Sequence, residues 1–207
     1  MLATNITRKN ENGDLNDICF LDGPEGKCKA LVSCGNMAHR NTCALMSSLS
    51  YRQAETSDIP GIARLRALKR GTKDYWSYRI SQYFEGEHNP QLALPPRVGF
   101  VAEEEGTVVG FIAGHLSRRY SCDGELQWIF VDPDRRGGGI ASELVRLLAK
   151  WFVEQNALKI CVDVDPSNTT ALRLYKKLGA VSLNPHWLVW NDIRVVTGQP
   201  DSTDAKS

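Results

Sequence analysis

The sequence predicts a domain of the α/β (α+β) class, with strands and helices around one main core. The first observation is the pattern of an antiparallel hairpin over residues 98–116. The second is a pair of apolar runs, 125–131 and 158–164, with the composition of buried strands. The third is helical spacing of apolar residues over 140–152. Strands that come first as a hairpin series and then alternate with helices therefore define the class.

Composition narrows the classes of partner. The chain has 207 residues, of which 42% are hydrophobic and 24% charged, enough for one good core. Its net charge of +1 gives no reason to expect capture of nucleic acid or of an anionic membrane. No apolar stretch approaches the ~20 residues that span a bilayer, and the first 30 residues lack the basic and apolar pattern of a signal peptide. We therefore expect a cytoplasmic protein that binds a small molecule in a pocket.

The domain organisation is expected to have three parts: a leader over residues 1–50, the main domain over 51–193 and a polar tail over 194–207. The spacing of the leader cysteines does not form the CxxC pairs of a structural zinc site, so we expect no metal. A small apolar satellite with reduced thiols and a poorly ordered segment both remain open. The leader cysteines are Cys19, Cys28, Cys34 and Cys43.

The first part of the main domain predicts an edge strand and two helices. The strand covers 51–54, and the helix after it has Ser57 or Asp58 as its cap. The second helix has Asp74 as its expected cap and ends at Gly86. One face of this second helix is expected to pack into the core. That face comprises Tyr75, Tyr78, Ile80, Tyr83 and Phe84.

Residues 131–144, VDPDRRGGGIASEL, join a predicted strand to a predicted helix through two arginines and three glycines. The first turn of a helix has unpaired backbone N–H groups and the positive end of the helix dipole. Bare glycine backbone lets an anion approach these donors closely. Arg135 and Arg136 add positive charge. The junction is therefore predicted to bind a ligand that carries phosphate.

Two common phosphate motifs do not fit this junction. A P-loop needs Gly-Lys-Ser or Gly-Lys-Thr, and neither tripeptide occurs in the chain. A dinucleotide fingerprint that starts at Gly137 would need glycine or alanine where Ser142 stands. For this segment alone, a plain glycine-rich turn with exposed arginines remains an alternative, although three glycines are more than a turn needs.

The segment downstream carries a second motif, on a short helix that Asn168 opens and Gly179 ends. With both motifs present, the sequence resembles the GCN5-related N-acetyltransferase (GNAT) superfamily from about residue 51 to 193. The pyrophosphate motif Q/R-x-x-G-x-G/A is matched from Arg136 to Ala141. The motif N-x-x-A-x-x-L-Y-x-K-x-G is matched by Asn168, Ala171, Leu174, Tyr175, Lys177 and Gly179.

This resemblance implies a fold and a co-substrate. The GNAT fold has a mixed, mostly antiparallel central sheet with splayed fourth and fifth strands, flanked by about four helices. Here those strands would be 125–131 and 158–164, and the splay would leave backbone free to pair with the pantetheine arm of acetyl-CoA. The residues expected to bind acetyl-CoA are Ile129, Phe130, Val131, Arg135, Arg136, Gly137, Gly138, Gly139, Ile140, Ala141, Asn168 and Tyr175.

The resemblance also implies catalytic groups. Tyr175 is the expected proton donor to the leaving thiolate, and Glu125 stands where many members carry the glutamate that deprotonates the amine. A partly buried carboxylate with a raised pKa would suit that task. A backbone amide near Ile129 would stabilise the oxyanion. His115 is an alternative base.

The expected activity is acetyl transfer to an amine of a small molecule or a protein, by direct attack in a ternary complex. Neither Cys122 nor Cys161 lies in a setting that favours a covalent intermediate. Two other readings stay open: a non-catalytic acyl-CoA-binding module of the same fold, and an interaction protein that acts through its leader. Related folds suggest a homodimer by analogy.

The acceptor itself is less defined by the sequence. An aromatic pocket with carboxylates would favour a cationic amine. The residues expected to form that pocket are Tyr75, Tyr78, Tyr83, Glu85, Glu87, His88 and Trp187.

Overall fold

The computed structural model describes residues 8–9, 15–16 and 49–198 of the chain. The chain divides into two units, residues 1–43 and 44–207. In the first unit, β1 (Arg8–Lys9) pairs antiparallel with β2 (Leu15–Asn16). The four leader cysteines lie outside the described residues, so the expectations about thiols, order and metal in the leader stay predictions.

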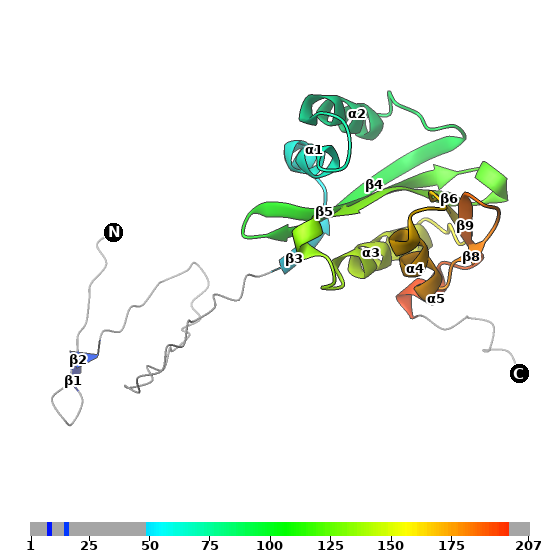
Figure 1. Ribbon diagram of the computed structural model, residues 1–207. Helices are drawn as coiled ribbons and strands as arrows, with labels where there is room; N and C mark the ends of the chain where they lie inside the picture. Colours follow the sequence, from blue (N-terminus) through cyan, green and yellow to red (C-terminus); the bar gives the residue numbers. More distant parts are fainter. Residues whose placement is uncertain (1–7, 10–14, 17–48, 199–207) are drawn as a thin grey trace, which may run out of the picture. The chain divides into compact units, whose positions relative to one another are not determined.

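A seven-stranded sheet forms the centre of the second unit (Figure 1). In order across the sheet, its strands are β3 (Leu49–Gln53), β4 (Ala93–Glu104), β5 (Thr107–Ser117), β6 (Gly124–Val131), β7 (Ile160–Asp163), β9 (Trp187–Trp190) and β8 (Val181–Ser182). Every neighbouring pair is antiparallel except β6 and β7, which run parallel. The predicted mixed, mostly antiparallel sheet is confirmed, with the predicted strand at its β3 edge.

The two parallel strands separate after a short stretch of pairing. β6 pairs with β7 only from Gly124 to Leu126, opposite Ile160 to Val162. The rest of β6 continues to pair with β5 as far as Val131, so within the described sheet its other edge is open. The predicted splay is confirmed, and it exposes backbone N–H and C=O groups of β6 that a ligand can use.

Helices cover both faces of the sheet (Figure 1). On one face lie α1 (Ile59–Ala67) and α2 (Lys73–Glu85). On the other lie α3 (Ile140–Glu154), α4 (Thr169–Lys177) and the single turn α5 (Arg194–Thr197). Each face has its own apolar core, because β6 turns Trp128 and Phe130 towards α1 and α2 and the alternate residues towards α3. The expectation of about four helices is confirmed.

Helix α2 begins and packs differently from the prediction. Thr72, not Asp74, caps it, because the Thr72 Oγ1 accepts a hydrogen bond of 3.2 Å from the backbone N–H of Tyr75. The buried face contains Trp76 with Ile80 and Tyr83, while Tyr75 and Tyr78 are 51% and 69% exposed. The prediction for Tyr75 and Tyr78 was therefore wrong. In a helix with aromatic residues on several sides, Trp76 buries the larger surface.

The end of the described chain extends the core. The first four residues assigned to the polar tail form α5, whose Val196 is buried and packs in the same core as α3. Residues 199–207 lie outside the described ranges. Across the described part of the chain, no helix has both the length and the apolar character needed to cross a bilayer. The cytoplasmic location and the homodimer stay predictions.

Candidate functional site

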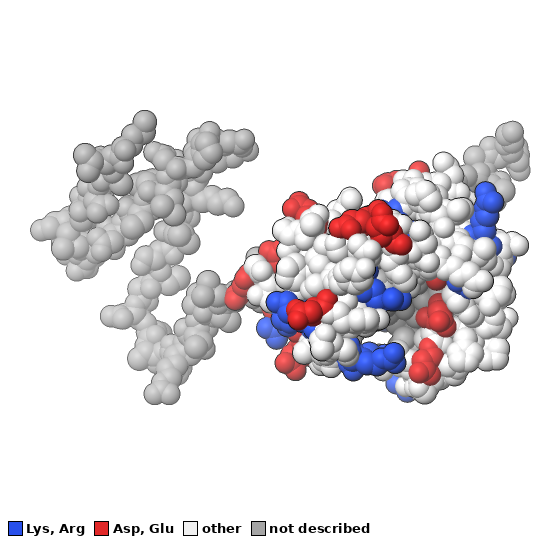
Figure 2. All heavy atoms as spheres, turned by 90° about the horizontal axis from the view of Figure 1, so that it is seen from above, with Lys and Arg blue, Asp and Glu red and all other residues white. Residues whose placement is uncertain are grey.

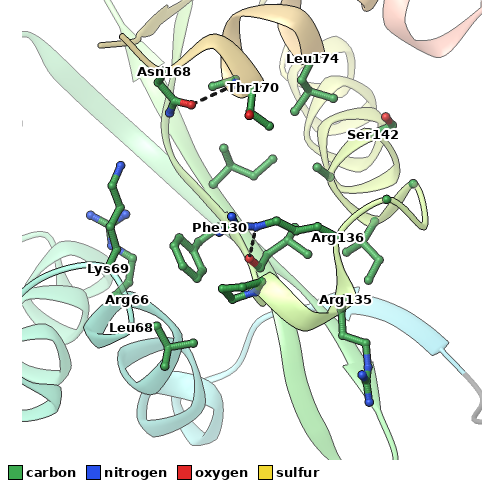
Figure 3. A pocket seen from close by; sticks show the side chains of 18 of the residues that line it. Arg66, Leu68, Lys69, Phe130, Arg135, Arg136, Ser142, Asn168, Thr170 and Leu174 are labelled. Atoms are coloured by element: carbon green, nitrogen blue, oxygen red, sulfur yellow. Dashed lines mark hydrogen bonds between the residues drawn. The ribbon is translucent and has the colours of Figure 1, made fainter.

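A cleft of about 820 Å³ opens at the end of β6, between α1 and the first turns of α3 and α4 (Figure 3). Ten of the twelve residues predicted to bind the co-substrate line it. Gly138 and Tyr175 are the two that do not. The predicted residues in the wall are Ile129, Phe130, Val131, Arg135, Arg136, Gly137, Gly139, Ile140, Ala141 and Asn168, joined by Arg66, Leu68, Lys69, Pro133, Ser142, Thr170, Ala171, Leu174 and Lys177.

The glycine junction forms one side of this cleft. After β6, a 3-10 turn (Pro133–Arg135) starts on Asp132, whose carboxylate accepts a hydrogen bond of 3.2 Å from the N–H of Asp134. Gly137 and Gly139 then adopt φ angles of +89° and +83°, a conformation that favours glycine. A Cβ at either position would find no described atom within 4 Å. The backbone of the junction therefore faces open space.

Helix α3 starts directly from this bare backbone. Its N-cap is Gly139, and among the described residues no side chain caps it. The first N–H groups of a helix have no partner within the helix and carry the positive end of its dipole. An anion that enters the cleft would meet these donors without a competing side chain.

The wall of the cleft is strongly basic. Among the described lining residues there are five arginines and lysines, and neither aspartate nor glutamate. The face seen from the α1 and α2 side differs, because basic and acidic side chains are interspersed on it (Figure 2). The described cleft wall lacks such acidic side chains. The five basic residues are Arg66, Lys69, Arg135, Arg136 and Lys177.

The two arginines of the junction are directed differently (Figure 3). The Arg135 side chain points away from the cleft, where its Nε lies 2.5 Å from a carboxylate oxygen of Glu104. Arg136 turns inward, and its Nε donates a hydrogen bond of 3.2 Å to the carbonyl of Val131. Its guanidinium carbon lies 5.5 Å from the ring centroid of Phe130. Arg136 is thus the junction arginine whose charge faces a ligand.

Helix α4 contributes Asn168 and Tyr175. Asn168 caps the helix, with its Oδ1 accepting a hydrogen bond of 3.2 Å from the N–H of Ala171, and it lines the cleft. Tyr175 is buried, and its ring packs edge to face on Trp190 with 5.7 Å between the centroids. Burial raises the pKa of the Tyr175 hydroxyl, so this group keeps its proton at neutral pH.

A second, buried cluster of polar side chains surrounds Glu125 at the start of β6. Its carboxylate is 3.0 Å from the Arg119 Nε and 3.8 Å from the His115 Nε2. The His115 Nδ1 is 3.0 Å from the Tyr83 hydroxyl. Burial raises the pKa of Glu125, although the hydrogen bond and charge of Arg119 oppose this shift. Glu125 and His115, predicted separately as candidate bases, therefore lie together.

The burial of His115 predicts a pH-dependent stability. Burial, with the charges of Arg97 and Arg119, lowers its pKa to about 4, so the folded protein holds it neutral while the unfolded chain protonates near its ordinary value. Its contribution to stability is therefore present above that ordinary value and is lost as the pH falls towards 4. From pH 7 to pH 5, the free energy of unfolding measured in urea should fall for the unsubstituted protein. For His115→Gln this fall should be smaller by about 2 kcal/mol.

A surface histidine provides the control for this measurement. His186 is exposed, so His186→Gln should follow the unsubstituted protein across the same pH range. Equal acid sensitivity of His115→Gln and the unsubstituted protein would contradict a neutral, buried His115.

The residues predicted to form an acceptor pocket are not in the described wall of the cleft. Tyr83 is fully buried beside His115, and Trp187 packs against Tyr120 and Arg119. Glu85 accepts hydrogen bonds from two side chains of its own helix. The cleft instead contains Arg66 of α1 and Lys69 just after it, and no motif in the sequence indicated either residue. The one local indication is that Arg66 stands four residues after buried Ile62, on the core face of an amphipathic helix.

Comparison with known proteins agrees with this fold. A model of the acetyltransferase (GNAT) family matches residues 65–180. Aminoglycoside N(6')-acetyltransferase type 1 of Salmonella typhimurium is 24% identical over 129 residues, which cover 56% of this chain and 89% of that protein. An acetyltransferase of Yersinia pestis is 32% identical over 91 residues, 44% of this chain and 58% of that protein.

A solved structure shows the same fold. Aminoglycoside N-acetyltransferase AAC(6')-Iy in complex with CoA aligns with a TM-score of 0.54 and 21% identity, over 64% of this chain and 88% of that one. The family match covers more than half of the chain and includes both the junction at α3 and helix α4. The chain belongs to the acetyltransferase (GNAT) family.

Proposed function

We propose that this chain transfers the acetyl group of acetyl-CoA to an amine of a small molecule or a protein. The observation that carries the proposal is the uncapped start of α3, where bare glycine backbone and open space meet a basic cleft. Phosphate groups fit such a set of donors. The related AAC(6')-Iy structure contains CoA, which is consistent with this ligand. Acetyl-CoA would supply the thioester that activates the acetyl group.

Residues of the cleft would hold acetyl-CoA by two kinds of contact. The backbone N–H groups from Gly137 to Ala141 would bind the pyrophosphate, with Arg136 adding its charge. The open edge of β6 from Ile129 to Val131 would offer strand-like hydrogen bonds to the pantetheine arm. Asn168 lines the same cleft at the start of α4.

Two groups of the chain would move protons during the reaction. Glu125 would accept the proton that the acceptor amine loses, directly or through water, since its raised pKa suits a base. Tyr175 would donate a proton to the leaving sulfur from its protonated hydroxyl. The N–H near Ile129 would stabilise charge that develops on the acetyl oxygen. Burial raises the pKa of Cys122 and of Cys161, which supports direct attack without a thiolate nucleophile.

Replacement of Tyr175 by phenylalanine tests the proton donor. Phenylalanine keeps the ring that packs on Trp190, so the folded state should retain its stability to within about 0.5 kcal/mol. Loss of the hydroxyl should lower kcat by about 10²-fold, the lower end of the usual effect of a general acid. Unchanged kcat in steady-state assays, with unchanged thermal stability, would leave Tyr175 only a packing role.

The proposed function itself is tested by measuring binding and turnover separately. Calorimetric titration should show that acetyl-CoA binds, and a thiol assay should show CoA release that depends on an added amine. Binding without release for any amine would favour the alternative, an acyl-CoA-binding module. Lack of binding by a folded protein would overturn the proposal.

A further inference from the structure

Arg66 occupies an unusual position on the wall of the cleft. It projects from α1, and its guanidinium carbon lies 4.1 Å from the ring centroid of Trp76 and 6.0 Å from that of Trp128. No carboxylate of residues 49–198 forms an ion pair with it. Its Nε is buried and finds no hydrogen-bond partner among the described groups. A guanidinium held in this way has donors left for a ligand.

The charge of Arg66 is also not compensated by its surroundings. Burial, together with the charges of Arg79 and Arg70, lowers its pKa to about 10, so it remains protonated at neutral pH in an environment that disfavours the charge. Lys69, from the same end of α1, lines the cleft beside it (Figure 3). An anion bound between these two side chains would relieve this electrostatic strain.

The wall formed by Arg66 and Lys69 lies across the cleft from the pyrophosphate cradle (Figure 3). The cradle belongs to α3, which covers one face of the sheet, while α1 covers the other face (Figure 1). β6 lies between them, and Phe130 belongs to the core on the α1 side. Arg66 and Lys69 therefore form a second basic wall, on the other side of β6 from the start of α3.

We propose that Arg66 and Lys69 bind an anionic group of the acceptor, so that the substrate is an amine that also carries a carboxylate. This inference rests on the proposed acetyl transfer. The planar fork of Arg66 suits a carboxylate, which accepts two parallel N–H donors. The lining contains no acidic side chain among its described residues, which disfavours a polycationic acceptor such as an aminoglycoside. The expected cationic amine relied on Glu85 and Glu87, which lie outside that lining.

Matched pairs of amines test the inference. Each α-amino acid and dipeptide of a panel is compared with its C-terminal amide, which keeps the amine but removes the anionic charge. Amine-dependent CoA release should favour the acid member of a pair. Arg66→Met should raise the KM of that acid about 10- to 100-fold and leave the amide nearly unchanged. Arg66→Lys should show an intermediate effect, because it keeps the charge without the fork.

Arg70→Met provides the matched control. Arg70 is exposed, follows Lys69 directly and is outside the cleft wall, so its replacement removes the same charge without the proposed contact. Its effect on the KM of the acid should stay below about threefold, as expected for a screened surface charge. Thermal melting of each variant checks that the fold is retained.

Binding of acetyl-CoA shows whether the anion at Arg66 belongs to the acceptor or to acetyl-CoA itself. If it belongs to the acceptor, the Kd of acetyl-CoA should be the same for Arg66→Met and the unsubstituted protein. A weaker Kd for acetyl-CoA, but not for acetyl-dephospho-CoA, would assign the wall to the ribose phosphate and overturn the inference. So would equal use of acids and amides, or turnover of neither while another amine is acetylated. Failure of acetyl-CoA to bind at all would instead overturn the proposed function.

Discussion

Gly139→Glu is expected to abolish the binding of acetyl-CoA. Gly139 is the N-cap of α3, and a side chain added there would extend into the open space in front of the helix start. A carboxylate in that position would accept hydrogen bonds from the N–H groups that are proposed to bind the pyrophosphate. It would also repel the negative charge of the pyrophosphate. Calorimetric titration should show micromolar binding to the unsubstituted protein and no measurable heat with the variant.

Gly106→Glu separates this effect from backbone strain. Gly106 lies in the hairpin turn between β4 and β5, has a φ of +75° and likewise has no described atom within 4 Å of an added Cβ. Either substitution forces a glutamate into a left-handed backbone conformation that glycine adopts more easily, which should destabilise the protein by about 1–2 kcal/mol. Only Gly139→Glu should lose the ligand. Binding that survives in Gly139→Glu would show that the junction does not hold the pyrophosphate.

The junction could be predicted because its signals are local. Three consecutive glycines before an amphipathic helix indicate exposed helix N–H groups, whatever the rest of the chain does. The same holds for the hairpin over 98–116 and for Asn168, whose capping bond involves a residue only three positions away. The sheet order and the splay came from the resemblance to a family, since long-range pairing has no local signal.

The part of the cleft wall formed by Arg66 and Lys69 could not be predicted from local signals. Arg66 lies near the end of β6 in the structure, but α2 and two long strands separate the two in the sequence. Its stacking on Trp76 also depends on which side of α2 is buried, and the sequence pattern favoured Tyr75 and Tyr78 instead. When the apolar pattern of a helix is weak, the sequence does not determine which face is buried to within one residue, a rotation of about 100° around the helix axis.

The contact between Glu125 and His115 shows a different limit. The two residues are opposite each other in the register of β5 and β6, which shifts by an irregularity just before them, between Ala113 and Gly114. A register shift of one residue turns every side chain to the other face. Each residue could be named as a candidate base from its place in the chain, but their proximity needed the structure.

Glu125→Gln is expected to reduce kcat/KM by about 10³-fold while the protein remains folded. Glutamine keeps the size of the side chain and can still accept a hydrogen bond from Arg119, but it cannot take a proton from the amine. In the unsubstituted protein, kcat/KM should fall as the pH drops through the pKa of Glu125, which burial raises above its ordinary value. The variant should lack this acidic limb.

Stability distinguishes this catalytic role from a structural one. Because burial raises the pKa of Glu125, its contribution to stability is greatest when it is protonated and is lost as the pH rises through that pKa. The unsubstituted protein should therefore gain stability relative to Glu125→Gln as the pH falls, although its activity falls over the same range. Glu103→Gln, which removes a carboxylate 2.7 Å from Arg52 at the β3 edge, should leave the pH profile of activity unchanged. If Glu125 only stabilised the fold, the activity and the stability of the protein would fall together as the pH changes. A buried base gives opposite trends, because it must be ionised to act and its ionised form is the one that destabilises the folded protein.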